Sequence, residues 1–170
     1  MSHTFISTSR LFVEEKYKKL CNCKIGIIGL GGVGSWAAEA LARCGIRKLV
    51  LVVYDHVTQS NINRQIQANV NTLGMSKISA LLSRLIEINP KIEVDLHDVF
   101  FSEKNNIEAL NQQSTDFWID ACDDINAKIE LINSFKKKER KKKIIICGGV
   151  GGKTNPFKIF QSDLCKTSND

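Results

Sequence analysis

Three charged side chains, far apart in the chain, occupy positions from which they could handle a polyphosphate. Arg64 and Lys77 lie on the long polar connection after one predicted strand, and Asp123 follows the end of another. Because the carboxyl ends of parallel strands meet at one edge of a sheet, we expect the three side chains to lie close together. Two cations around a triphosphate and an acid for Mg²⁺ suit the attack of a carboxylate on the α-phosphorus of ATP. The set favours an ATP-using adenylyltransferase.

Each of these residues also has an ordinary structural interpretation. Arg64 would be a surface residue, Lys77 would stand in the first turn of a helix, and Asp123 would cap a helix. A second functional class, a nicotinamide-dependent oxidoreductase, would use an acid about 20 positions after the glycines to hold a ribose. Asp55 satisfies that count. A dehydrogenase does not need the two cations and the acid, so their combination favours adenylation.

The phosphates should rest on a glycine-rich turn. The sequence Gly29-Leu30-Gly31-Gly32-Val33-Gly34-Ser35 follows an apolar run of strand length and precedes the helix-forming stretch Trp36–Arg43. Gly29 would let the chain turn sharply off the strand, Gly31 would let the backbone approach a phosphate, and Gly34 would let the helix pack closely. The start of the helix then offers free N–H groups and a positive dipole end.

The remaining elements must bring these residues together. Hydrophobic periodicity predicts helices at Ser9–Leu20, Trp36–Arg43, Lys77–Asn89, Ser102–Leu110 and Ile125–Phe135. It predicts strands at Lys24–Gly29, Leu49–Tyr54, Lys91–His97 and Phe117–Cys122, a buried strand at Lys143–Cys147 and an edge strand at Pro156–Phe160. This alternation predicts an α/β fold, a Rossmann-like, doubly wound and mostly parallel sheet with helices on both faces. We expect an N-terminal helical segment at residues 1–22 and an ATP-binding domain at 23–170.

Size and composition narrow the class of protein. A chain of 170 residues forms one domain, and it has neither a run of transmembrane length nor an apolar signal core. We therefore expect a cytoplasmic protein without disulfides. Its six cysteines do not form the two Cys-x-x-Cys hooks of a zinc site, so zinc is not favoured.

The net charge of +6 is concentrated in one place. Seven of the 24 basic residues and one of the 18 acidic residues lie in the octet Lys136–Lys143, which leaves 17 of each elsewhere. A solvated helix end explains such an octet, and contact with RNA phosphates is the alternative.

Several stretches resemble the ubiquitin-activating-like adenylating superfamily: Gly29–Ser35, Ser60–Gln65, Gly74–Lys77, Ile88–Pro90 and Asp120–Asp123. A closer resemblance is to the tRNA threonylcarbamoyladenosine dehydratases. It is carried by Gly32–Arg43, Asn63–Ile66, Gly148–Gly152 and Asp163–Thr167, and it extends from about Arg10 to Asp170.

The resemblance implies an enzyme that uses ATP and Mg²⁺ to activate the carboxylate of threonylcarbamoyladenosine in tRNA, which then closes into a cyclic form with loss of water. It implies catalytic roles for Arg64, Lys77 and Asp123, with Asp123 at the Mg²⁺. It also implies a homodimer in which Arg10 reaches the partner's ATP site. The nucleotide-binding residues would be Gly29, Gly31, Gly32, Gly34, Ser35, Asp55, Asn61, Arg64, Gln65 and Lys77.

Two departures from the family pattern keep alternatives open. Val53 stands where the family has a ribose-binding aspartate, and losing a charged hydrogen bond of about 1.5–3 kcal/mol would weaken ATP binding about ten- to a hundredfold. The family also continues beyond the position of Asp170, so we expect its C-terminal part to be absent here. The alternatives are an adenylyltransferase that activates a ubiquitin-like sulfur-carrier protein and a degenerate, non-catalytic nucleotide-binding module.

Overall fold

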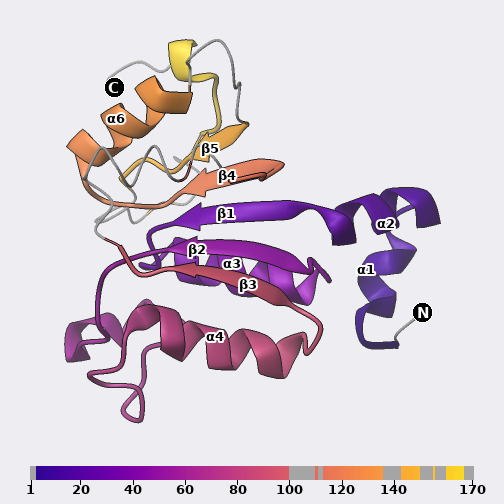
Figure 1. The fold of residues 1–170 in the computed structure, drawn as a ribbon, viewed down its shortest axis with the longest axis horizontal. Helices are drawn as coiled ribbons and strands as arrows, with labels where there is room; N and C mark the ends of the chain where they lie inside the picture. Colours follow the sequence, from indigo (N-terminus) through magenta and orange to yellow (C-terminus); the bar gives the residue numbers. More distant parts are fainter. Residues whose placement is uncertain are drawn as a thin grey trace.

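The computed structural model describes residues 3–99, 110, 113–135, 143–149, 155 and 160–166. Its centre is a five-stranded parallel sheet with the strand order β3-β2-β1-β4-β5 (Figure 1). The strands are β1 (Lys24–Ile28), β2 (Lys48–Val52), β3 (Glu93–His97), β4 (Phe117–Asp120) and β5 (Ile144–Ile146). The predicted fold class is confirmed.

Helices cover both faces of this sheet. The helices α3 (Gly34–Arg43) and α4 (Lys77–Ile88) pack through Ala38, Ala42, Leu81 and Leu85 on one face of β1 and β2. The helix α6 (Ile125–Phe135) packs on the opposite face, where it meets Trp118 of β4. Alternate residues of each buried strand supply the two faces, which is why the central strands read as continuous apolar runs.

The order of the strands creates one crevice at the carboxyl edge of the sheet. The chain runs outward from β1 through β2 to β3, and then returns to place β4 on the other side of β1. The connections after β1 and β4 therefore leave the sheet in opposite directions from neighbouring strands, and this is where open α/β sheets bind ligands. The N–H of Ala121 donates to the carbonyl of Ile28 (2.8 Å), which holds the two strand ends together.

The N-terminal segment differs from the single helix predicted at Ser9–Leu20. It forms a short 3₁₀ turn, η1 (His3–Phe5), followed by α1 (Ile6–Arg10) and α2 (Glu14–Asn22). The break falls at 11–13, where Val13 adopts an extended conformation, and Glu14 and Glu15 then supply the acidic first turn that suits a new helix. In Figure 1 both helices lie at the end of the sheet where the strands begin.

Two further predictions need correction or lie outside the described residues. The strand β5 forms as predicted but is not buried, because Ile145 is exposed and β5 is the outermost strand of the described sheet. The predicted helix at Ser102–Leu110 falls outside the described residues except for the buried Leu110, and the strand at Pro156–Phe160 does so except for Phe160. Among the described residues, no helix is both long enough and apolar enough to span a membrane.

Candidate functional site

The glycine turn after β1 is tightly packed on its inner side. Gly29 has a φ of +84°, and a Cβ atom there would lie 2.8 Å from the carbonyl oxygen of Ala121. A Cβ at Gly34 would lie 1.9 Å from the carbonyl oxygen of Gly29. Only glycine allows both the turn and the close approach of α3 to it. These two positions behave as the sequence predicts.

The outer side of the same turn is open. A Cβ added at Gly31 would meet nothing within 4 Å in the described part of the chain, and no side chain caps the start of α3 at Val33. A helix N-terminus without a cap presents N–H groups and a positive dipole end to an anion. Backbone and space at this position fit a phosphate.

Ser35 is committed to the turn itself. Its buried hydroxyl donates to the carbonyl of Gly31 (2.6 Å) and accepts from the N–H of Ile66 (3.3 Å). Ser35 therefore joins the glycine turn to the loop that crosses it, and its contacts in this structure are internal.

Arg64 lies against the turn. A Cβ at Gly32 would lie 3.4 Å from Cγ of Arg64, so the alkyl part of this side chain passes over the glycines. The Nη1 atom donates to the carbonyl of Ser60 (2.7 Å) and to Oδ1 of Asn63 (3.0 Å), and the residue is exposed. The structure thus places the side chain of Arg64 beside the glycine turn.

Asn61 and Gln65 shape the loop rather than project from it. Asn61 ends the short 3₁₀ helix η2 (Gln59–Asn61), and its Oδ1 accepts from the N–H of Thr58 (3.1 Å). The Oε1 of Gln65 accepts from Nε2 of Gln67 (3.3 Å). Both residues are buried, so in this structure their contacts lie within the loop that carries Arg64.

Lys77 and Asp55 form an ion pair. Lys77 is buried at the start of α4, and its Nζ donates to Oδ2 of Asp55, while the N–H of His56 donates to Oδ1 (2.7 Å). Partial burial opposes ionisation of the carboxyl, but these donors, with Lys77 foremost, hold the pKa of Asp55 below its ordinary value. Asp55 is thus occupied by Lys77 instead of standing free for a ribose.

Asp123 lies on the connection after β4 and is exposed. Its neighbour Asp124 caps α6, because Oδ1 of Asp124 accepts from the N–H groups of Asn126 (2.8 Å) and Ala127 (3.0 Å). The sequence allows Asp123 either to cap this helix or to hold a metal. In the structure, Asp124 and not Asp123 caps the helix. The connection after β4 contacts the glycine turn, since backbone atoms of Ala121 and Cys122 are the nearest to a Cβ at Gly29.

Arg10 lies elsewhere in this chain. It is the exposed last residue of α1, which lies at the opposite end of the sheet from the glycine turn (Figure 1). The backbone N–H of Arg47, just before β2, donates to the carbonyl of Cys21 (3.2 Å), which ties α2 to that end. The structure brings Arg64, Lys77 and Asp123 to one edge of the sheet and does not bring Arg10 to them.

Sequence reasoning missed a buried ion pair beside this site. Asp120 is fully buried at the end of β4, and its Oδ2 accepts from Nζ of Lys128 (2.8 Å) while Oδ1 accepts from the N–H of Cys122 (3.1 Å). Burial, together with the hydrogen bond to Asp120, raises the pKa of the Cys122 thiol to about 12. The available signal was a lysine one turn into the helix that follows a strand ending in an aspartate.

Two further contacts were also missed. Gln67 is buried and its Nε2 donates to the carbonyl of Leu30 (3.0 Å), which fastens the loop to the glycine turn. The Nε1 of Trp36 donates to the carbonyl of Arg64 (2.9 Å). A sequence gives no sign of such contacts between a side chain and a distant backbone carbonyl.

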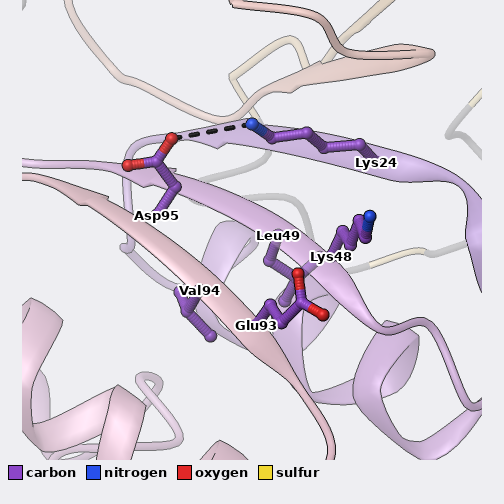
Figure 2. A pocket seen from close by; sticks show the side chains of 6 residues that line it. All are labelled: Lys24, Lys48, Leu49, Glu93, Val94 and Asp95. Atoms are coloured by element: carbon purple, nitrogen blue, oxygen red, sulfur yellow. Dashed lines mark ion pairs between the residues drawn. The ribbon is translucent and has the colours of Figure 1, made fainter.

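Two other kinds of feature, metal-ligand clusters and surface hollows, do not indicate an alternative functional site in the described part of the chain. The described residues contain no group of three or more His, Cys, Asp or Glu side chains that could hold a metal. A hollow of about 390 Å³ lies where β1, β2 and β3 begin, at the other end of the strands (Figure 2). Two of its charged residues form an ion pair, with Nζ of Lys24 3.6 Å from Oδ2 of Asp95.

The family is decided by a match over almost the entire chain. Residues 6–168 match the model of the ThiF family. The chain belongs to the ThiF family. A tRNA threonylcarbamoyladenosine dehydratase of Haemophilus influenzae is 40% identical over 98% of this chain and 62% of its own length. A ubiquitin-like modifier-activating enzyme 5 of Caenorhabditis elegans is 34% identical over 62% of this chain and 25% of its own length.

The solved structures agree with the sequence comparison. The E. coli tRNA N6-threonylcarbamoyladenosine dehydratase in complex with ATP superposes with a TM-score of 0.90 at 35% identity. The match covers 96% of this ThiF-family chain and 66% of the E. coli chain. This chain therefore spans a little over three fifths of the length of the curated dehydratases that it matches.

Proposed function

We propose that this chain binds ATP on its glycine turn and activates the carboxylate of threonylcarbamoyladenosine in tRNA, so that the activated group closes into a ring with loss of water. The observation that carries this proposal is the side chain of Arg64 lying along Gly32 beside the open face at Gly31. The similarity to dehydratases over 98% of the chain supports the choice of substrate.

In this proposal the residues divide the work by their chemistry. Gly31, Gly32 and Gly34 let the phosphates approach the start of α3, and Arg64 and Lys77 neutralise the triphosphate. Asp123 would hold Mg²⁺, which seldom has an all-protein cage at phosphate sites. When bound, this ion would supply positive charge at the phosphates. The absence of a three-ligand cluster among the described residues is compatible with this sharing.

Asp55, Asn61, Gln65 and Ser35 take supporting roles in the same proposal. Their hydrogen bonds and ion pair hold Lys77, Arg64 and the turn, so they act on the nucleotide mainly through those groups. Gly29 forms the turn, and its contact surface faces Ala121 and Cys122 instead of the ligand.

We further propose a homodimer in which Arg10 completes the site of a second copy. Arg10 lies far from the glycine turn of its own chain, so it could reach such a site only in a partner chain. Three consecutive apolar residues, Leu11, Phe12 and Val13, are exposed directly after Arg10. Exposed apolar runs of this kind favour a protein contact. For a tRNA substrate, we propose a cytoplasmic location.

The test of the proposed function is a reaction with ATP, Mg²⁺ and tRNA that carries the threonylcarbamoyl group. We expect cyclised nucleoside, read by mass spectrometry, together with AMP. Arg64→Ala should abolish most of the product, whereas Arg47→Ala, an exposed arginine at the amino end of β2, should not. Absence of both cyclised nucleoside and AMP with the unchanged protein would contradict the proposal.

A second candidate is the activation of a ubiquitin-like carrier protein, including a sulfur carrier. It is favoured by the 34% identity to a ubiquitin-like modifier-activating enzyme over residues that make up 62% of this chain. This function predicts exchange of pyrophosphate into ATP that depends on a carrier with a Gly-Gly tail. Exchange that proceeds without a carrier and responds to tRNA would exclude it.

The position of Val53 motivates the third candidate, a non-catalytic nucleotide-binding module. Val53 follows β2 and packs, partly buried, against the core beneath α3 and α4. Weak or absent ATP binding in calorimetry would favour this candidate. Val53→Asp should then strengthen ATP binding about ten- to a hundredfold, since it restores a charged acceptor for the ribose. An unchanged affinity would show that position 53 does not contact the ribose.

A further inference from the structure

Trp36 is an unusual residue for the first turn of α3, because its side chain is not in the core. The residue is 55% exposed, although a tryptophan gains stability mainly by burying its large ring. Its one polar atom is nevertheless engaged, since Nε1 donates to the carbonyl oxygen of Arg64 at 2.9 Å. Core packing therefore does not account for Trp36, and its contact with the crossing loop does.

The first turn of α3 holds that loop at two adjacent positions. Ser35 accepts from the N–H of Ile66 through its hydroxyl (3.3 Å), and Trp36 donates to the carbonyl of Arg64 (2.9 Å). The same turn of helix carries Gly34 and so lies directly on the glycine turn. The backbone of Arg64 is thus fastened to the element that would receive the phosphates.

The side chain of Arg64 is fixed by separate contacts. Its alkyl part lies 3.4 Å from a Cβ position at Gly32, and its guanidinium donates to the carbonyl of Ser60 and to Asn63. A long arginine that is anchored at the backbone loses less freedom on binding an anion than a mobile one. Removing the backbone anchor should loosen the guanidinium without changing its charge.

We propose that Trp36 is a positioning residue for nucleotide binding. Its indole N–H fixes the backbone of Arg64 so that the alkyl part of the arginine side chain lies over Gly32 and the guanidinium is held beside the glycine turn. The inference rests on the proposed binding of ATP and assigns to Trp36 a role that depends wholly on Arg64.

Trp36→Phe tests this role because it keeps an aromatic ring and removes the N–H donor together with the five-membered ring of the indole. In isothermal titration calorimetry with the full chain and ATP, we expect the dissociation constant to rise about three- to tenfold, the range for one hydrogen bond. The melting temperature should stay within a degree or two, since the ring lies on the surface. Arg64→Ala should weaken binding more strongly on its own.

The decisive measurement is the double variant. In the Arg64→Ala background, Trp36→Phe should cause no further loss of ATP affinity, because the positioned group is gone. In the Arg47→Ala background, the three- to tenfold loss should persist, since Arg47 lies at the other end of the sheet. Such a pattern separates positioning from a general effect on the fold.

The binding measurements test the role of Trp36 separately from the proposed binding of ATP. Binding of ATP by the unchanged protein, with an equal affinity in Trp36→Phe, overturns the role of Trp36 alone. An equal loss with and without Arg64 also overturns it, because Trp36 would then act by another route. No detectable binding of ATP by the unchanged protein overturns both the inference and the proposed function.

Discussion

Two ion pairs close the connections at the carboxyl edge of the sheet, and they are built alike. After β2, Asp55 pairs with Lys77 at the start of α4; at the end of β4, Asp120 pairs with Lys128 in α6. In each case an aspartate next to a strand end is bound by a lysine of the following helix. The shared pattern fastens both loops that surround the glycine turn.

The two pairs differ in which partner water can reach. The side chain of Asp55 is 53% exposed and that of Lys77 is 7% exposed, whereas Asp120 is fully buried and Lys128 is 15% exposed. If Lys77 turned to a phosphate, Asp55 would be hydrated at little cost. If Lys128 left, Asp120 would remain a buried charge without a counterion. We therefore expect the first pair to open for a ligand at a lower cost than the second, which should mainly stabilise the fold.

The largest expected effect concerns the buried pair. Lys128→Met should lower the free energy of unfolding by about 3–5 kcal/mol, because it leaves the carboxylate of Asp120 uncompensated in the interior. Urea titration followed by circular dichroism would measure the change. We expect ATP binding by this variant to decrease only to the extent that the protein unfolds.

A matched control is Lys91→Met, at an exposed lysine between α4 and β3. This variant should change the free energy of unfolding by less than about 0.5 kcal/mol. The double variant Asp120→Asn with Lys128→Met should recover part of the loss, since it removes the buried charge. A loss below 1 kcal/mol for Lys128→Met would show that the two ion pairs do not differ as the burial suggests.

The next effect concerns the exchangeable pair and ATP. Lys77→Met should weaken ATP binding about ten- to a hundredfold, the range for one hydrogen bond to a charged group. Asp55→Asn should leave the affinity unchanged or tighten it, because it releases the amine of Lys77 from its carboxylate. Calorimetric titration of both variants with ATP measures the contrast. If Asp55→Asn weakened binding as much as Lys77→Met, Asp55 would itself contact the nucleotide.

Much of the fold could be predicted because its signals are local. Helix α6 was predicted with its observed bounds, Ile125–Phe135, from its apolar spacing, and Gly29 and Gly34 were assigned from their place between a strand and a helix. The break at 11–13 was missed because apolar residues there suggest continuous packing. In the structure, Leu11 and Phe12 are exposed, so two of the apolar residues that suggested a helix face do not pack in the core.

The site could be predicted only as a set of charges at one edge. Arg64, Lys77 and Asp123 follow from strand ends in a parallel sheet, a rule that applies to the sequence directly. The partners of these residues depend on side chains that meet across 22 or more positions, as for Lys77 with Asp55 and Trp36 with Arg64. Whether Asp55 faces a ribose or a lysine depends on distances in three dimensions. These distances cannot be read from composition or from the spacing of residues.

The smallest effect is a dependence of stability on pH that belongs to the exposed pair. The ion pair with Lys77 and the N–H of His56 prevail over partial burial and lower the pKa of Asp55 in the folded state. A lowered pKa means that the pair stabilises the fold above the ordinary pKa, and that this contribution is lost as the pH falls through the lowered value. Since more than half of the carboxylate side chain is exposed, its size should stay below about 1 kcal/mol.

The measurement is the difference in unfolding free energy between the unchanged protein and Asp55→Asn, taken from pH 7 down to pH 3. The difference should be constant above the ordinary pKa of 3.8 and should shrink below it. It should also decrease in high salt, because the carboxylate is open to screening ions. A difference that persisted undiminished at pH 3 would mean that Asp55 stabilises the loop without its charge, and the contrast between an exchangeable and a structural pair would then rest on ATP binding alone.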